Sequence, residues 1–447
     1  MAGIKRKPSN QCICVEQYIR QFFIQRSEDA MLNQVDVGQG RRSRPLLELC
    51  AVLAGVIVYT SANGFMTGGL SVAGRQLGLG EVQVGLILGS GALAGVIAAP
   101  VWGYVTDVWN RRSLLLLAVS MVAVGPAAMA FITGKLVSLL PLVAGGILAT
   151  ARLIQAVFGA ALIPAGQAYM AEVTHSSRRV SGMSILSAAI SSGTLLGSLL
   201  LWLTGQFSVA SGFAIIALLG VLACAAIAAF ASKEVSHLQP NSRESTLPYA
   251  KLWHYFAMTL IGFTCYTTVP PIFAVRLMDR HGMDAAMAVT QTGLVLTIGV
   301  FAVCLSQVFI AIQPKWRPAA MLRWGSVGIF VGLLLLLQAE SLLGMCLAMG
   351  MIGFAVGFLA PAILGAISLI SGDGVQGKIG GLNMAARGLG SAIGPILGTM
   401  LYQQSPDAPF FGSLVLIIGV FSLTFFSSAE NGNGDMLSVD ISSEKNK

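Results

Sequence analysis

The chain has 447 residues, of which 55% are hydrophobic and only 10% are charged. Soluble domains carry about 25% charged residues, so the composition excludes an ordinary water-soluble protein and predicts that most of the surface faces lipid. The net charge of +8 does not indicate nucleic-acid binding, because the basic residues lie in a tail and in loops and are not interleaved with aromatic residues.

Residues 1–45 precede the first apolar run and are predicted to be a cytoplasmic tail. They are basic but have no apolar core followed by small residues, so they do not resemble a cleaved signal peptide. The seven cysteines show no metal-ligand spacing. We therefore predict free thiols, no metal and no cofactor.

Twelve apolar runs follow, each long enough for a helix that spans a bilayer. They are continuously apolar and do not alternate with period two, which favours helices over barrel strands. The predicted spans are Leu47–Val72, Val82–Val105, Ser113–Thr133, Leu139–Ala171, Gly182–Thr204, Val209–Ala231, Leu252–Val275, Ala286–Ile312, Ala319–Gln338, Leu342–Ile370, Ile379–Gln403 and Pro409–Ser428.

The longest polar break divides the runs into six and six. This predicts an all-α integral membrane protein with two pseudo-symmetric six-helix halves. The predicted parts are the tail 1–45, an N-terminal half 46–231, a cytoplasmic linker 232–250, a C-terminal half 251–428 and a cytoplasmic tail 429–447.

Lysine and arginine predict the orientation, because cytoplasmic loops are enriched in them. If the N-terminus is inside, eleven of these residues lie in inside loops and four in outside loops. The eleven are Arg111, Arg112, Arg178, Arg179, Lys233, Arg243, Lys251, Lys315, Arg317, Arg323 and Lys378, and the four are Arg75, Lys135, Arg276 and Arg280. Both termini are therefore predicted to be cytoplasmic, in a multi-pass protein of the cell (inner) membrane.

An internal repeat agrees with two related halves. At an offset of 197 residues Pro164 aligns with Pro361, and a pair of glycines four residues apart recurs. Small residues at this spacing let helix backbones approach closely. The predicted packing residues are Gly193, Gly197, Gly390, Gly394 and Pro395.

The loop after the second span reads Gly103-Tyr-Val-Thr-Asp107-Val-Trp-Asn110-Arg111-Arg112. On its own it is an ordinary positive-inside loop, but it resembles the signature of the major facilitator superfamily. Val108 replaces a basic residue of that pattern and Asn110 a glycine, which leaves the charge network of the loop less complete. Asn tolerates left-handed backbone angles better than most residues, so the turn can survive.

The resemblance extends from the first span to the last and implies a transporter that works by alternating access. The family often pairs an acidic residue at the end of the fourth span with an arginine of this loop. The gating residues that it implies are Gly103, Asp107, Arg111, Arg112 and Glu172. A solvated helix end is an equal alternative for the last of these.

Arg152 lies about ten residues inside the fourth apolar run, where a charge is costly and is by default a functional candidate. Arg152-Leu-Ile-Gln155 and the small residues after it resemble a second motif of the family's exporters, with Ala156 in place of a glycine. In that family the arginine faces the central cavity and is tied to proton coupling or substrate binding.

Arg387 is a second charge within a span, and no Asp or Glu lies in the middle of a span. The cavity is then predicted to be positive and to favour an anion. The predicted substrate and proton-coupling residues are Arg152, Gln155, Arg387, Asn63 and Tyr266.

The resemblance is to the drug and metabolite exporter branch of the superfamily, and within it to exporters of carboxylate siderophores. The fifth span lacks the proline of the exporters' packing motif, which weakens the antiporter assignment. The predicted function is proton-coupled export of a small organic, siderophore-like anion by a monomer in a lipid membrane. The alternatives are a multidrug efflux pump of the same fold, a membrane sensor that does not transport, and, least favoured, a membrane enzyme.

Overall fold

The computed structural model describes residues 44–134, 140–173, 179–231, 249–312, 317–371 and 376–425. The chain divides into two units, Met1–Leu47 and Glu48–Lys447. The arrangement described below is that of the second unit.

All regular elements of the described residues are helices. They are α2 (Arg44–Gln76), α3 (Glu81–Val108), α4 (Arg111–Gly134), α5 (Pro141–Gly159), α6 (Leu162–Val173), α7 (Arg179–Gly205), α8 (Val209–Phe230), α9 (Tyr249–Thr268), α10 (Pro270–His281), α11 (Ala285–Ile312), α12 (Pro318–Gln338), α13 (Leu342–Ser371), α14 (Gln376–Tyr402) and a last helix, Ala408–Phe425.

Within the described residues, eleven helical segments are long and apolar enough to cross a membrane. They correspond to eleven of the twelve predicted spans. The remaining predicted span, Ile379–Gln403, corresponds to α14, which at 27 residues is long enough to cross a membrane. Its many glycines, together with Asn383 and Arg387, make it less apolar than the others. The predicted all-helical membrane fold is confirmed.

Two of the predicted spans are broken helices. α5 and α6 are separated at Ala160 and Ala161, because Pro164 has no N–H and its ring displaces the carbonyl one turn earlier. α9 and α10 are separated before Pro270, which stands at the first position of a new helix. The new helix continues to Gly282, whose φ of +62° ends it.

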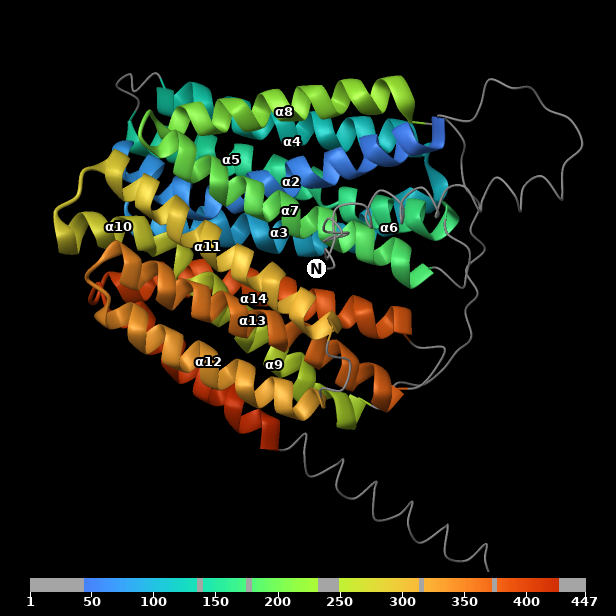
Figure 1. Cartoon of the computed structure of the whole chain (residues 1–447). Helices are drawn as coiled ribbons and strands as arrows, with labels where there is room; N and C mark the ends of the chain where they lie inside the picture. The colour runs from blue at the N-terminus through green and yellow to red at the C-terminus, as the bar shows by residue number, and fades with distance from the viewer. Residues whose placement is uncertain are drawn as a thin grey trace, which may run out of the picture. The chain divides into compact units, whose positions relative to one another are not determined.

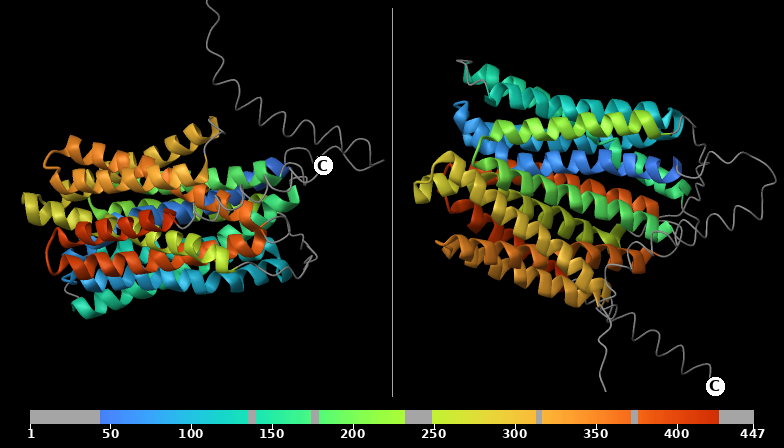
Figure 2. Two further views of the ribbon diagram at one scale, coloured as in Figure 1. Left: turned by 90° about the horizontal axis from the view of Figure 1, so that it is seen from below. Right: turned by 45° about the horizontal axis from the view of Figure 1, so that its top comes forward.

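The helices lie side by side in two groups (Figures 1 and 2). We call α2–α8 the N-terminal half and α9 to the last helix the C-terminal half. The halves meet where α3 packs against α14 and α7 against α11. These contacts are close because glycines form them: a Cβ at Gly205 of α7 would lie 2.7 Å from the backbone nitrogen of Thr290.

The repeated glycine pairs lie at equivalent packing contacts in the two halves. Gly193 and Gly197 of α7 face α2, where a Cβ on Gly193 would lie 2.5 Å from the carbonyl oxygen of Ile57. Gly390 and Gly394 of α14 face α9, where a Cβ on Gly390 would lie 2.5 Å from the carbonyl oxygen of Leu260. Each half thus lets its fifth span approach its first span backbone to backbone.

Candidate functional site

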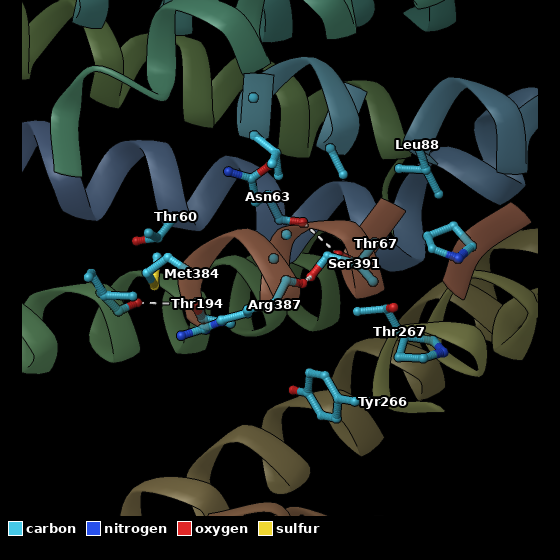
Figure 3. Close-up of a pocket in the computed structure, with 18 of the residues that line it drawn as sticks. Thr60, Asn63, Thr67, Leu88, Thr194, Tyr266, Thr267, Met384, Arg387 and Ser391 are labelled. Carbon is cyan, nitrogen blue, oxygen red and sulfur yellow. Dashed lines mark hydrogen bonds between the residues drawn. The ribbon is translucent and has the colours of Figure 1, made fainter. Parts of the chain in front are cut away.

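A cavity of about 950 Å³ lies between the two halves and is lined from both. Polar side chains of α2 and α7 meet those of α9 and α14 around it (Figure 3). Most of the remaining lining residues are apolar or glycine. A volume of this size and a lining of this kind suit a drug-sized ligand.

Arg152 of α5 reaches this cavity from the N-terminal half. Its side chain is only 7% exposed. Nη1 donates to Oδ1 of Asn63 at 2.8 Å and to Oε1 of Gln155 at 3.1 Å. Burial of a charge costs several kcal/mol unless it is hydrogen-bonded or solvated, and these two neutral acceptors offset part of that cost.

Asn63 and Gln155 hold the arginine in different ways. Asn63 of α2 lines the cavity and donates from Nδ2 to the carbonyl of Tyr59 at 2.9 Å, which fixes its amide with the oxygen toward Arg152. Gln155 is fully buried and is not among the lining residues. The predicted polar pair on α5 is therefore an arginine at the cavity and a glutamine behind it.

Arg387 of α14 lines the cavity from the C-terminal half and is exposed to it. Its guanidinium carbon lies 4.5 Å from the centre of the Phe263 ring. This is a cation–π contact that leaves the N–H groups at the edge of the guanidinium plane free for other partners. Tyr266 lines the same cavity (Figure 3).

The described residues that line the cavity include two arginines and no Asp, Glu or His. The structure therefore brings together four of the five predicted substrate residues, Asn63, Arg152, Tyr266 and Arg387, and sets Gln155 behind them.

The gating residues are described only in part. Gly103 of α3 lines the cavity, and Arg112 donates from Nη2 to the carbonyl of Ala228 on α8. The side chains of Asp107, Arg111 and Glu172 lie outside the described part of the structure. The ion pair of Glu172 with this loop stays a prediction.

Asn110 has a role that the motif comparison did not suggest. Its Oδ1 accepts from the backbone N–H of Arg112 at 3.0 Å and of Ser113 at 3.3 Å. The residue in the place of the family glycine therefore caps the N-terminus of α4.

Sequence reasoning placed Arg276 and Arg280 in a loop after the seventh span, and the loop was wrong. Both lie on α10, because the seventh span does not end at the predicted Val275 but restarts at Pro270 and runs to His281. Arg276 is 1% exposed and, like Arg280, pairs with Asp407.

A second set of charges was also missed. Arg75, at the end of α2, forms ion pairs with Glu81 of α3 and Asp279 of α10. Arg75 and Glu81 are six residues apart, so their proximity could be seen in the sequence. The pairing of Arg75 with Asp279, 204 residues away, could not.

Comparison with known proteins places the chain in a family. Residues 51–395 match the model of the Major Facilitator Superfamily. The chain is 25% identical over 359 residues to Multidrug resistance protein 2 of Bacillus subtilis, covering 75% of this chain and 84% of that protein. It is 23% identical over 364 residues to Quinolone resistance protein NorA of Staphylococcus aureus, covering 77% and 88%.

Solved structures show the same fold. A D-xylose–proton symporter superposes with a TM-score of 0.68 at 17% identity over 86% of this chain and 97% of that one. The nucleoside transporter NupG has a TM-score of 0.66 at 14% identity over 86% and 98%. A two-half helical membrane fold, a cavity between the halves and a family match over most of its length together show that this chain is a transporter of the Major Facilitator Superfamily, and not an enzyme.

Proposed function

We propose that this transporter exports a small organic anion, coupled to protons, and that the anion binds between Arg152 and Arg387. The observation that carries the proposal is the placement of two guanidinium groups, one from each half, around one cavity. Among the described lining residues no carboxylate neutralises them. A carboxylate ligand would do so, and in a site of low dielectric this attraction is strong.

The two arginines suit different parts of such a ligand. Arg152 is held by Asn63 and Gln155, so its orientation is set before the ligand arrives. A fixed, planar guanidinium recognises a carboxylate through paired hydrogen bonds. Arg387 is exposed and held mainly by its stack on Phe263, which suits it to a more variable part of the ligand.

The test is uptake into inverted membrane vesicles with an imposed pH gradient. Citrate and a citrate-based siderophore serve as anionic probes, and vesicles with Arg152→Ala serve as the control. We expect gradient-dependent uptake of at least one anion by the parent protein and loss of it in the variant. Uptake of neither anion, in vesicles that contain folded protein, would refute the proposal.

Multidrug efflux is the second candidate function. It is supported by the names of the Bacillus subtilis and Staphylococcus aureus relatives, which refer to multidrug and quinolone resistance, and by the largely apolar lining of the cavity. The same vesicles separate the two functions when a quinolone and a quaternary ammonium dye are added as probes. Pumping of the cationic dye, unchanged in Arg152→Ala, would favour multidrug efflux.

A further inference from the structure

The two ends of the helices differ in how closely the halves approach each other around the cavity. We call the end with the α3–α4 turn the Asn110 end and the end with the α2–α3 turn the Arg75 end. Toward the Asn110 end, Gly103 and Gly380 line the cavity only about five residues from the ends of α3 and α14. Nothing lies within 4 Å of a Cβ at either glycine. Toward the Arg75 end, the last lining residue of α2 is Thr67, nine residues and roughly 13 Å before its end at Gln76.

The space beyond Thr67 is filled by side chains from both halves. Leu70 and Ala73 of α2 and Phe273 of α10 are all fully buried there. Gly85 of α3 lies so close to α14 that a Cβ on it would be 2.8 Å from the carbonyl oxygen of Pro395. The two halves are therefore in contact at the Arg75 end.

Four polar side chains lie at this contact, two from each half. Arg75 of α2 donates from Nη1 to Oδ1 of Asp279 at 2.6 Å and from Nη2 to Oδ2 at 2.8 Å. Nε and Nη2 of Arg75 also donate to Oε1 of Glu81 on α3, at 3.2 and 2.8 Å. Tyr402 of α14 donates its hydroxyl hydrogen to Oδ2 of Asp279 at 2.7 Å.

The pair of Arg75 with Asp279 joins residues 204 positions apart in the sequence and belongs to both halves. It is bidentate, which is the strongest and most geometry-specific form of an arginine–carboxylate contact. Glu81 holds the guanidinium on one side and Tyr402 holds the carboxylate on the other. By contrast, Arg276 and Arg280 pair with Asp407 within the C-terminal half.

We propose that Arg75, Glu81, Asp279 and Tyr402 form a latch, the Arg75 latch, that holds the two halves together when the cavity is accessible from the Asn110 end. The proposal rests on the proposed export function and on the alternating access that the family resemblance implies. When the cavity becomes accessible from the Arg75 end the halves separate there, and the bidentate pair breaks. The latch therefore sets the balance between the two states and limits the rate at which the Arg75 end opens.

The test measures access to the cavity and needs no cargo. Thr67→Cys places a thiol on the cavity wall below the latch, and a membrane-impermeant maleimide is added to intact cells or to inverted vesicles. The chain without this substitution gives the background labelling. The measured quantity is the ratio of labelling from the Arg75 end to labelling from the Asn110 end.

We expect Arg75→Gln and Asp279→Asn each to raise this ratio about three- to tenfold, in the range of charge-assisted contacts that are partly exposed. The double variant should equal either single variant, because one contact is lost in all three. Tyr402→Phe, which keeps the ring, should raise the ratio less. The matched control is Arg280→Gln, which removes an arginine on the same helix as Asp279 that pairs within one half.

Unchanged ratios in Arg75→Gln and Asp279→Asn, additive effects in the double variant, or an equal effect of Arg280→Gln would each overturn the latch. Thermal unfolding of each purified variant checks that it is folded. The labelling ratio is measured without cargo and does not report on the anion site. A failure of anion transport with the predicted labelling ratios would therefore count against the proposed function and not against the latch.

Discussion

At the scale of single residues, Gly91 of α3 leaves the space that the Arg152 side chain occupies. A Cβ at this position would lie 2.7 Å from both Cγ and Nε of Arg152. With Asn63 and Gln155 as hydrogen-bond acceptors, the guanidinium is held by three helices, α2, α3 and α5. Such support fixes a binding group before its ligand arrives, which reduces the entropy lost on binding.

Gly91→Ala should therefore impair transport without unfolding the protein. The added methyl group meets Cγ and Nε of Arg152 and not backbone, so Arg152 is displaced at a cost of about 1–3 kcal/mol in stability, the usual cost of overpacking. A displacement near 1 Å at a binding group is enough to reduce transport roughly tenfold. Uptake into inverted vesicles and the Tm of the purified protein measure the two effects.

Gly95→Ala is the matched control for this substitution. It lies one turn further along α3, where the nearest atom to a Cβ is the carbonyl oxygen of Ala156 at an ordinary 3.5 Å. If both variants transport alike, the space at Gly91 has no bearing on the site.

Arg152→Lys should remain in the membrane but reduce anion transport about tenfold or more. Lysine keeps the charge but cannot donate to Asn63 and a carboxylate in the fixed planar geometry of a guanidinium. Arg387→Lys should cost less, roughly two- to fivefold, because Arg387 is exposed to the cavity and makes a stacking contact that an ammonium group partly retains. Initial rates of uptake compare the two, and equal losses would contradict this ranking.

Part of this site could be predicted from the sequence. Arg152 and Arg387 were found because a charge within an apolar run is rare. The role of Gln155 as a hydrogen-bond acceptor behind Arg152 could not be predicted. A side chain three residues from Arg152 can point either into the cavity or behind it, depending on its rotamer. Gly91 gave no signal at all in helices that are rich in glycine.

At the scale of helices, close packing depends on the glycines of α7 and α14. Gly197 of α7 packs against α2, and a Cβ on it would lie 2.8 Å from the backbone nitrogen of Phe65. Gly394 of α14 packs against α9, and a Cβ on it would lie 2.8 Å from the carbonyl oxygen of Thr264. Backbone atoms cannot turn away as a side chain can, so each added methyl must separate two helices.

Gly197→Ala should therefore destabilise the protein by about 1–3 kcal/mol, the usual cost of overpacking. Gly394→Ala should do the same in the other half. Gly146→Ala on α5 is the control, because nothing lies within 4 Å of a Cβ there. Thermal unfolding in detergent ranks the three variants, and a Tm of Gly197→Ala equal to that of Gly146→Ala would show that the contact is dispensable.

Helix positions were easier to predict than helix interruptions. A run of apolar residues marks a span directly, and the predicted start of α8 at Val209 agrees with the structure. The end of the seventh span was wrong because Arg276 and Asp279 are polar, and polarity suggested a loop. Their charges are accommodated by partners outside α10, Asp407 in the turn before the last helix and Arg75 of α2, which no local pattern reveals.

At the scale of the whole molecule, the excess of lysine and arginine in alternate loops predicts the orientation. Reporter fusions after Glu234 and Lys447 should give a cytoplasmic signal, and a fusion after Lys135 an external one. The expected pattern follows from the retention of basic loops on the cytoplasmic side during insertion. An external signal at Glu234 would contradict both the orientation and the division into six and six helices.

The contact between the halves is the part of the fold that the sequence alone could not supply. The pairing of α3 with α14 and of α7 with α11 joins helices that are far apart in the sequence. Its close approach depends on complementary surfaces, such as Gly85 against Pro395, and not on a periodic pattern. The resemblance to a family predicted the two halves but not the residues that join them.

Gly262, Gly380 and Gly381 form part of the cavity wall, and nothing lies within 4 Å of a Cβ at any of them. A mutation at these positions would add volume to the chamber without disturbing a packed neighbour. Evolution can therefore narrow or reshape the accepted range of cargo by single nucleotide changes, at almost no cost to folding. Homologues that carry different cargo are then expected to differ at these bare positions sooner than at the arginines.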